Sequence, residues 1–296
     1  MAVSVTCYSD PGCPWAYSAN PALAVLRWRY GSGLRWRLVT VGLTETPEEY
    51  LERGYTPALM ALGNRAFRER FGMPFATEPR ERVCATGPAC RAIVAARLLA
   101  PGREWDVLRA LQLAWFTTAR LLDRAGDIAA VLAAVDGLDV PAIVGAIDSP
   151  EVVEAYQADR AEARTAEGSP TEAQGKAVTH GGPVRYTAPS LIFSREETRL
   201  EAGGWQSLEA YDVLIANLDP ALRRAEPAAS PAEVLEGFPD GLATQEIAAV
   251  MAPHNLDPDR DAAEDALVQL VAEGRATRIA AGDDAVWRPA AASVPA

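Results

Sequence analysis

The chain has 296 residues and a net charge of −12, with 49% hydrophobic and 23% charged residues, which is ordinary for a globular protein of one or two domains. No apolar run approaches the ~18 residues that a membrane-spanning helix needs, so the sequence predicts no membrane segment. The charge is uneven, because residues 225–296 hold 13 acidic and 4 basic residues, and this argues against binding to nucleic-acid phosphates.

A cysteine is predicted to lie between the first strand and the first helix. The strand is expected over Val3–Tyr8 and the helix over Pro21–Tyr30, with Cys13 and Pro14 between them. Pro14 suits a first helical position, where a missing N–H costs nothing. The free N–H groups and partial positive charge of a helix start favour a thiolate. We therefore predict that Cys13 is a nucleophile with a pKa below the ~8.5 of a free cysteine. Asp10 is interpreted as a solvated loop carboxylate.

A second strand over residues 34–41 completes a strand–helix–strand unit. From about residue 46 to residue 176 the pattern is helical. Helix starts are indicated by Ser/Thr-Pro pairs, of which Thr46-Pro47 and Ser169-Pro170 also have a glutamate placed for a capping box. The other two pairs begin at Thr56 and Ser149. The sequence therefore predicts a helical insertion of well over a hundred residues.

Beyond the insertion, Ala188-Pro189 directly precedes an apolar strand that ends near Phe193. A hairpin strand is expected over Thr198–Ala202 and a closing helix over Ser207–Leu222. A cis bond before proline is cheap compared with other cis peptide bonds, so a cis Ala188–Pro189 bond is the preferred interpretation. The alternative is a trans proline that opens an edge strand.

These features together resemble a known family. Cys13-Pro14-Trp15 after Asp10-Pro11 is similar to the active-site motif of the DsbA-like branch of the thioredoxin superfamily, including its cytosolic FrnE-type members. That family also carries a helical insertion between its second and third strands. The resemblance implies an α/β, thioredoxin-like fold over residues 1–224, with the helical insertion at about 46–176.

The resemblance also implies a substrate groove beside Cys13, in which the cis-proline loop faces the thiol and pairs with an extended substrate. The groove residues expected on this basis come from the two loops and are Pro14, Trp15, Tyr17, Thr187, Ala188 and Pro189. Trp15 and Tyr17 are interpreted equally well as core residues.

The chain departs from the family pattern at one position, because the family reads Cys-Pro-Trp-Cys and this chain has Ala16. A single thiol can form a mixed disulfide but cannot resolve it. Release then requires an external low-molecular-weight thiol or a remote cysteine, Cys84 or Cys90. Cys90 is interpreted as a buried helical residue, and Cys84 as a more exposed loop residue. Cys7 is expected to be a small hydrophobe inside the first strand.

Three functions remain open at this point. The first is a thiol-disulfide oxidoreductase or thiol transferase that acts through Cys13 on protein or small-molecule thiols and disulfides. The second is an enzyme similar to glutathione transferases of the kappa class or 2-hydroxychromene-2-carboxylate isomerases, which use a bound low-molecular-weight thiol. The third is a non-catalytic adaptor on a degenerate thioredoxin fold. No tightly bound cofactor is expected, and no metal site, since the chain has no Cys-x-x-Cys pair.

The location and assembly are also predicted. A first strand that begins at Val3 leaves no room for a secretion signal, so we expect a cytoplasmic protein whose cysteines stay reduced. No membrane partner and no nucleic-acid partner are expected, and a homodimer is a candidate assembly.

An Ala/Pro linker over residues 225–230 separates a C-terminal segment. Helices over Ala243–Met251 and Asp259–Glu273 and a hairpin around Gly282 follow in the order of a winged helix. We expect residues 231–296 to form a small winged-helix-like domain. DNA reading is the usual function of that fold, but the acidity of this segment favours a packing role against the body or a second subunit.

Overall fold

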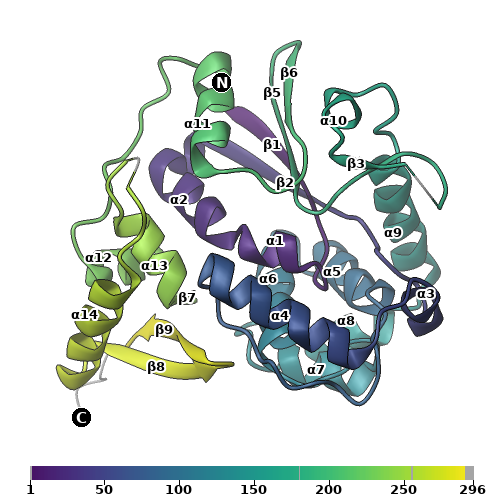
Figure 1. Cartoon of the computed structure of the whole chain (residues 1–296), viewed down its shortest axis with the longest axis horizontal. Helices are drawn as coiled ribbons and strands as arrows, with labels where there is room; N and C mark the ends of the chain where they lie inside the picture. The colour runs from purple at the N-terminus through teal and green to yellow at the C-terminus, as the bar shows by residue number, and fades with distance from the viewer. Residues whose placement is uncertain (1, 180, 255, 291–296) are drawn as a thin grey trace.

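The computed structural model describes residues 2–179, 181–254 and 256–290. Figure 1 shows a sheet with helices around it, a large group of helices beside it and a C-terminal unit. The elements of the N-terminal part are β1 (Val3–Ser9), α1 (Pro14–Ser18), α2 (Asn20–Tyr30), a short 3-10 turn (Gly31–Gly33), β2 (Leu34–Thr40), α3 (Pro47–Glu52), α4 (Pro57–Phe71), α5 (Gly87–Leu99), α6 (Glu104–Thr117), α7 (Ala125–Leu132), α8 (Val140–Ala146), α9 (Pro150–Ala163) and α10 (Pro170–Ala173). They are followed by β3 (Ala177–Val178), β4 (Arg185–Tyr186), β5 (Ser190–Arg195), β6 (Thr198–Ala202) and α11 (Leu208–Leu218).

The main sheet has the strand order β2-β1-β5-β6. β1 is parallel to β2 and antiparallel to β5, and β5 and β6 form an antiparallel hairpin. Alternate β1 residues Val3, Val5 and Cys7 are buried in a core with α2 and α11, as the period of two in a strand requires. The strand–helix–strand unit, the late hairpin and the closing helix agree with the sequence prediction.

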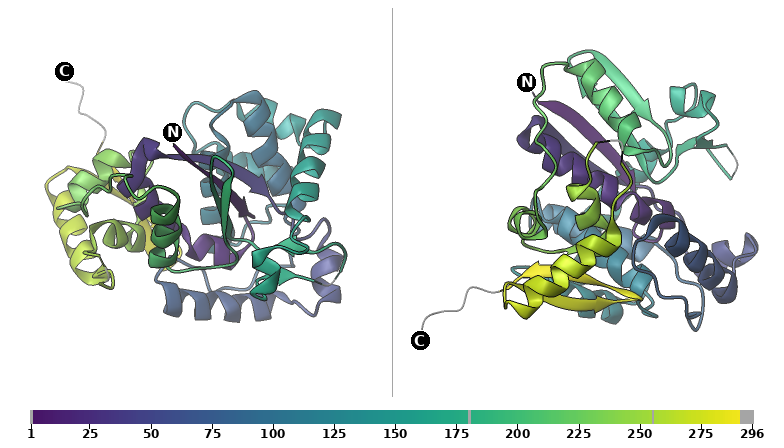
Figure 2. Two further views of the ribbon diagram at one scale, coloured as in Figure 1. Left: turned by 90° about the horizontal axis from the view of Figure 1, so that it is seen from above. Right: turned by 60° about the vertical axis from the view of Figure 1, so that its left-hand side comes forward.

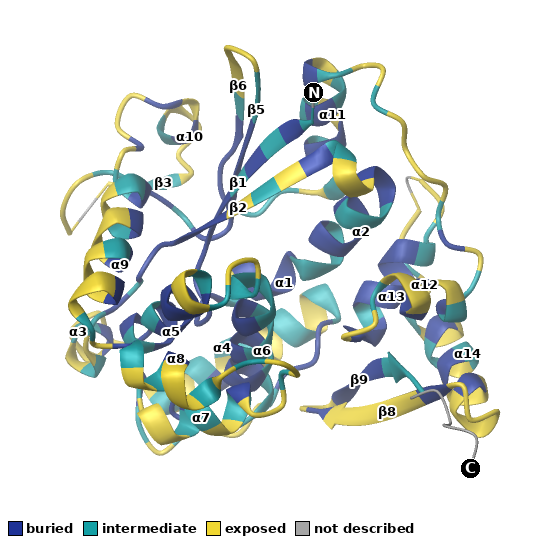
Figure 3. Ribbon diagram, turned by 180° about the vertical axis from the view of Figure 1, so that it is seen from behind, coloured by how far each residue is buried: buried dark blue, intermediate teal, exposed yellow. Residues whose placement is uncertain are grey.

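The helical insertion runs from α3 to α10, between β2 and the later strands, as predicted. Four of its helices begin at the prolines of the predicted Ser/Thr-Pro pairs, namely Pro47, Pro57, Pro150 and Pro170. Figure 3 shows buried residues along α5 and α6 and exposed residues on the outer helices. The largest apolar cluster lies here and is centred on α5 and α6. No helix in the described part of the chain is long and apolar enough to cross a bilayer.

The C-terminal segment consists of α12 (Pro231–Gly237), β7 (Leu242–Ala243), α13 (Thr244–Met251), α14 (Arg260–Ala272), β8 (Ala276–Ala281) and β9 (Asp284–Pro289). Its sheet has the order β7-β9-β8. Helix α12 and the short strand β7 were missed from the sequence. The order of elements agrees with the winged-helix expectation, which stays a prediction, and residues 291–296 of the expected domain lie outside the described residues.

This segment packs against the N-terminal part of the chain, where α13 lies along α2 (Figure 2). Ala24 and Val25 of α2 share a core cluster with Val250 and Trp287. The indole N–H of Trp28 donates to the carbonyl oxygen of Glu226, with 2.8 Å between the atoms. The segment is therefore held by both apolar packing and hydrogen bonds.

Candidate active site

Cys13 lies at the N-cap of α1, in the loop that follows β1. Its thiol donates a hydrogen bond to the carbonyl oxygen of Ala188, with 3.0 Å between Sγ and O. The Ala188–Pro189 peptide bond is cis. The fold therefore brings the predicted nucleophile and the predicted proline loop into direct contact, although 175 residues separate Cys13 from Ala188.

The loop that carries Cys13 is held by local hydrogen bonds and by close packing. The N–H of Cys13 donates to the carbonyl oxygen of Asp10 at 3.2 Å. The N–H of Gly12 donates to Asp10 Oδ1 at 2.9 Å. A Cβ atom on Gly12 would lie 2.6 Å from Thr86 and 2.8 Å from Trp115, so only glycine fits between the loop and the helical insertion.

The predicted lowering of the Cys13 pKa is wrong. The residue is 6% exposed, and burial raises its pKa to about 12, with the charge of Asp10 contributing in the same direction. The pKa is lowered, to a smaller extent, by the N–H groups of Ala16 and Trp15 and by the charge of Arg185. The helix start does stabilise the thiolate, but the loss of water around the sulfur is the larger effect.

Asp10 is not the solvated loop carboxylate expected from the sequence, because it is 0% exposed. Its Oδ2 accepts from the N–H of Leu43 at 3.0 Å and from the hydroxyl of Thr86 at 3.1 Å. The thiol of Cys90 also donates to Oδ2. Burial raises the pKa of Asp10, and these hydrogen bonds oppose the rise. Asp10 thus joins the Cys13 loop to the loop after β2 and to α5.

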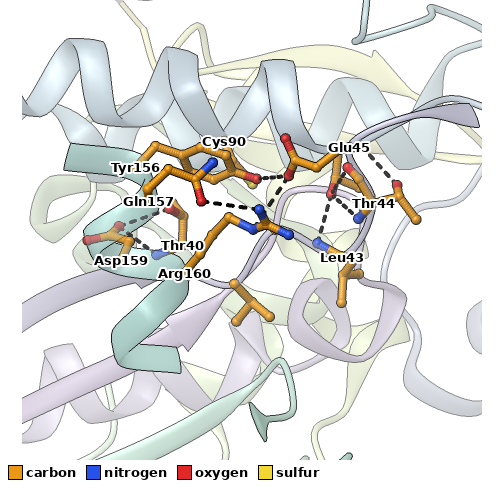
Figure 4. A network of polar contacts seen from close by, with 12 residues as sticks. Thr40, Leu43, Thr44, Glu45, Cys90, Tyr156, Gln157, Asp159 and Arg160 are labelled. Atoms are coloured by element: carbon orange, nitrogen blue, oxygen red, sulfur yellow. Dashed lines mark hydrogen bonds and ion pairs between the residues drawn. The ribbon is translucent and has the colours of Figure 1, made fainter. Parts of the chain in front are cut away.

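A polar network continues from this point towards α9 (Figure 4). The hydroxyl of Tyr156 donates to Glu45, and Arg91 and Arg160 each lie 3.6 Å from a carboxylate oxygen of Glu45. Asp159 accepts from the N–H and the hydroxyl of Thr40 at the end of β2. The network ties the insertion to the edge of the sheet that carries the site.

Cys13 lies in a cleft of about 600 Å³. The charged residues among the described lining are Arg70, Lys176 and Arg185, and no acidic residue is among them. Lys176 is the only lysine in the sequence. In a chain of net charge −12, this concentration of positive charge favours an anionic ligand.

The indole rings of Trp15 and Trp205 contribute aromatic surface to the cleft lining. Trp15 is 39% exposed, and the guanidinium of Arg70 lies 5.4 Å from its ring centroid. The cleft therefore combines a thiol, aromatic surface and cationic groups.

Three of the six expected groove residues line this cleft. Trp15, Thr187 and Ala188 line it, and Pro14 and Pro189 adjoin these residues in the chain. Tyr17 does not belong to the groove, because it is fully buried and its ring stacks on Phe116 with 4.8 Å between centroids. Its α-helical position turns it away from the cleft and into the core of the insertion.

The two candidate resolving thiols are both buried, and all four cysteines are free. The expectation of an exposed Cys84 is wrong, because its side chain is enclosed and burial raises its pKa to about 12. Cys90 is buried as expected, and burial and the Asp10 charge hold its pKa well above the ordinary value. Cys7 is a buried strand residue, as predicted.

Four cleft residues could not be predicted from the sequence, namely Arg70, Lys176, Arg185 and Trp205. They come from α4, from the segment around β3 and β4, and from the loop after β6. No motif connects them, and only their shared cleft identifies them. The isolated lysine was visible in the sequence, but its position relative to Cys13 was not.

No family model and no curated protein matches the sequence. Solved structures do match over 74% of this chain. The cytosolic disulfide reductase DsbM from Pseudomonas aeruginosa is 17% identical with a TM-score of 0.51, and 98% of its chain is covered. The same protein with GSH is 19% identical with a TM-score of 0.50, again over 98% of its chain. A structure described as a probable DsbA oxidoreductase from Streptomyces coelicolor is 17% identical with a TM-score of 0.52, over 91% of its chain.

These likenesses and the sheet order define the class of fold. The chain has an α/β, DsbA-like thioredoxin fold with a helical insertion. Within that class it carries Cys-Pro-Trp-Ala at residues 13–16.

Proposed function

We propose that this protein is a thiol-disulfide oxidoreductase or thiol transferase that acts through Cys13 as its only reacting thiol. The observation that carries the proposal is the contact between Cys13 Sγ and the carbonyl oxygen of Ala188 in the cis-proline loop, at 3.0 Å. This contact lies in an open cleft with aromatic and cationic lining. A substrate sulfur that enters the cleft meets the thiol and the backbone of the proline loop together.

The proposed reaction has two exchange steps. Cys13 loses its proton and attacks a substrate disulfide, so that a Cys13–substrate disulfide forms while the other substrate sulfur leaves as a thiolate and takes a proton. A second, external thiol then attacks the substrate sulfur of this mixed disulfide. Cys13 leaves and regains a proton, and the external thiol ends in a disulfide with the substrate. The N–H groups of Ala16 and Trp15 and the charge of Arg185 stabilise the Cys13 thiolate.

An external thiol is proposed because no second cysteine of the chain is placed to attack the mixed disulfide. Ala16 occupies the position at which a resolving cysteine would follow Cys13, and Cys84 and Cys90 are buried. The cationic lining of the cleft supports an anionic low-molecular-weight thiol of the glutathione type. One solved structure of similar fold is described as DsbM with GSH.

A second candidate is favoured by the protonation of Cys13. With a pKa near 12, the Cys13 side chain is a neutral thiol at pH 7. A neutral thiol can donate a hydrogen bond to a thiolate held noncovalently in the cleft. Such a site would serve a glutathione-transferase-like or isomerase-like enzyme, in which Cys13 forms no covalent bond.

As part of either proposal we place the protein in the cytoplasm, in keeping with its four free cysteines.

Intact-mass analysis of the protein purified from its own host, with and without reductant, tests the first proposal. We expect a reducible adduct that is absent from Cys13→Ser, and its mass would identify the thiol. The matched control is Cys7→Ala, which should keep the adduct because Cys7 lies outside the cleft. Saturable binding of a small thiol without any adduct would favour the second candidate. Neither adduct nor binding would favour a non-catalytic adaptor.

A further inference from the structure

A second cavity lies between the sheet-bearing part of the chain and the C-terminal segment. It has a volume of about 170 Å³ and shares no lining residue with the Cys13 cleft. Its walls come from β1, α2, α6 and the connection from α12 to β7. We propose that this cavity binds a small carboxylate with a short apolar chain, and that the carboxylate pairs with Arg27.

Arg27 is the first reason for the proposal. Its guanidinium lies 4.7 Å from the ring centroid of Trp105 and 5.5 Å from that of Trp36. It makes no hydrogen bond or ion pair with any described residue, although Arg27 is only partly exposed to solvent. Burial lowers its pKa, and the charges of Glu246 and Asp106 oppose that shift. A guanidinium stays charged in proteins, and an enclosed charge without a partner is costly. Acceptor oxygens of an occupant would supply the hydrogen bonds that Arg27 does not make with described residues.

The acidic residues around the cavity act on Arg27 through their charge but form no hydrogen bond with it. Glu246 accepts both guanidinium N–H groups of Arg109 at 2.7 Å and the N–H of Ala243. Asp106 is paired with Arg103. The third acidic residue of the lining, Asp240, is exposed at the rim. Among the described lining residues, Arg27 is thus the cation without a hydrogen-bonded carboxylate.

Further donors line the same cavity. Gln112 is 2% exposed, and its Oε1 accepts from the amide of Asn20 at 3.1 Å. The amide nitrogen of Gln112 has no hydrogen-bond acceptor among the described residues. The same is true of the Ser9 hydroxyl, which is also buried. Donors at a cavity wall that have no protein acceptor are available to a ligand, and together with a guanidinium they match the two oxygens of a carboxylate.

The remainder of the lining is apolar. The apolar side chains of the lining include Leu23, Trp105, Leu108, Phe238 and Leu242. At a liquid volume of about 30 Å³ for each water molecule, the cavity has room for about five waters or for a few heavy atoms of a ligand. Apolar surface opposite a cluster of donors suits a carboxylate with a short hydrocarbon chain better than a phosphate, which is polar on all sides.

Occupation of the cavity would join the two parts of the chain. Cys7 and Ser9 belong to β1, whereas residues 237–242 belong to the C-terminal segment. A ligand that contacts both binds only when the segment is docked. By mass action it must stabilise the docked, folded state.

The test uses the full chain with butyrate as the probe. The neutral isostere butyramide and inorganic phosphate serve as the two comparison ligands. We expect butyrate to raise Tm saturably and to change tryptophan fluorescence, since Trp36 and Trp105 flank Arg27. Butyramide should have no effect and phosphate a much weaker one. Arg27→Met should weaken butyrate binding by about tenfold or more, because a charge-assisted pair is lost.

Two control variants separate this cavity from other sites. Arg278→Met removes another arginine that lies over a tryptophan, 5.6 Å from the ring centroid of Trp287, and should bind butyrate normally. Lys176→Gln changes the Cys13 cleft and should also leave butyrate binding unchanged. The proposal is overturned if wild-type protein shows no saturable response, if butyramide or phosphate matches butyrate, or if Arg27→Met binds as tightly as wild type. Should Arg27→Met fail to fold, calorimetric titration of wild-type protein with butyrate and butyramide, together with Gln112→Leu, decides between these outcomes.

Discussion

The thiol of Cys90 donates a hydrogen bond to the carboxylate of Asp10, with 3.5 Å between Sγ and Oδ2. This contact places a second thiol behind the Cys13 loop, on the far side of a buried carboxylate. Burial, together with the charge of Asp10, raises the pKa of Cys90 and keeps that thiol protonated. The geometry disfavours Cys90 as a resolving nucleophile in the described conformation, because the attacking species in disulfide exchange is a thiolate.

Removing the Asp10 charge should make Cys13 more acidic. The Asp10 carboxylate raises the Cys13 pKa, so Asp10→Asn should shift the midpoint of Cys13 alkylation to lower pH. The measurement is alkylation rate against pH, with Cys13→Ser as the blank. Asp148→Asn removes an exposed carboxylate and should leave the midpoint unchanged. An unchanged or higher midpoint in Asp10→Asn would contradict the electrostatic role of Asp10.

Restoring a second thiol should restore dithiol exchange. Ala16 lies one turn after Cys13 in α1, where a cysteine could resolve a mixed disulfide intramolecularly. We expect Ala16→Cys to reduce insulin faster than wild type, by on the order of tenfold or more, since an intramolecular step replaces a bimolecular one. The double variant Cys13→Ser/Ala16→Cys should lose the gain. If Ala16→Cys is no faster than its parent, the cleft differs from a dithiol site in more than this residue.

The cationic cleft should discriminate between disulfides by charge. Lys176→Gln removes one positive charge from the rim and should slow reaction with the dianionic disulfide DTNB by about threefold at low salt. Reaction with the cationic disulfide cystamine should be unchanged or faster. Arg35→Gln, which changes an exposed residue outside the cleft, is the matched control. Equal slowing of both disulfides would point to a structural defect instead of an electrostatic effect.

The ion pair between Arg109 and Glu246 should contribute strongly to docking of the C-terminal segment. Glu246 is fully buried and forms two 2.7 Å hydrogen bonds with Arg109. Glu246→Gln leaves an enclosed guanidinium without a counter-charge, and we expect a loss of about 3 kcal/mol or more in the free energy of unfolding. Chemical denaturation of the variant and of wild type measures this difference in the free energy of unfolding. The double variant Arg109→Met/Glu246→Gln should recover part of this lost stability. If its loss in the free energy of unfolding equals the sum of the losses of the two single variants, the two charges are not coupled.

The C-terminal segment should not bind DNA. It holds 13 acidic and 4 basic residues, and nonspecific binding depends on positive charge. A gel shift of the full chain with random duplex DNA at low salt should show free DNA only. A clear shift that weakens as salt is added would overturn this prediction and would suggest a regulator coupled to thiol chemistry. The packing role is tested separately by deleting residues 225–296. A lower Tm of the truncated chain would show that the segment stabilises the rest of the protein.

Local sequence was sufficient wherever a short stretch determines its own structure. The prolines at 47, 57, 150 and 170 begin helices because proline suits a first helical turn. The side chains of Thr56, Ser149 and Ser169 also supply cap hydrogen bonds to their helices. The strand–helix–strand unit around Cys13 and the cis bond before Pro189 were likewise anticipated from spacing and resemblance.

The tertiary structure decided the properties that depend on what surrounds a residue. Cys13 and Asp10 were assigned the wrong environments, because a loop motif does not reveal that α5, α6 and the proline loop enclose it and remove its water. For the same reason the sequence left Tyr17 open between the groove and the core, and the structure places it in the core. The cationic cleft and the Arg27 cavity each collect side chains from segments far apart in the chain. Burial and electrostatic fields are sums over all neighbours in space, so only the folded chain determines them.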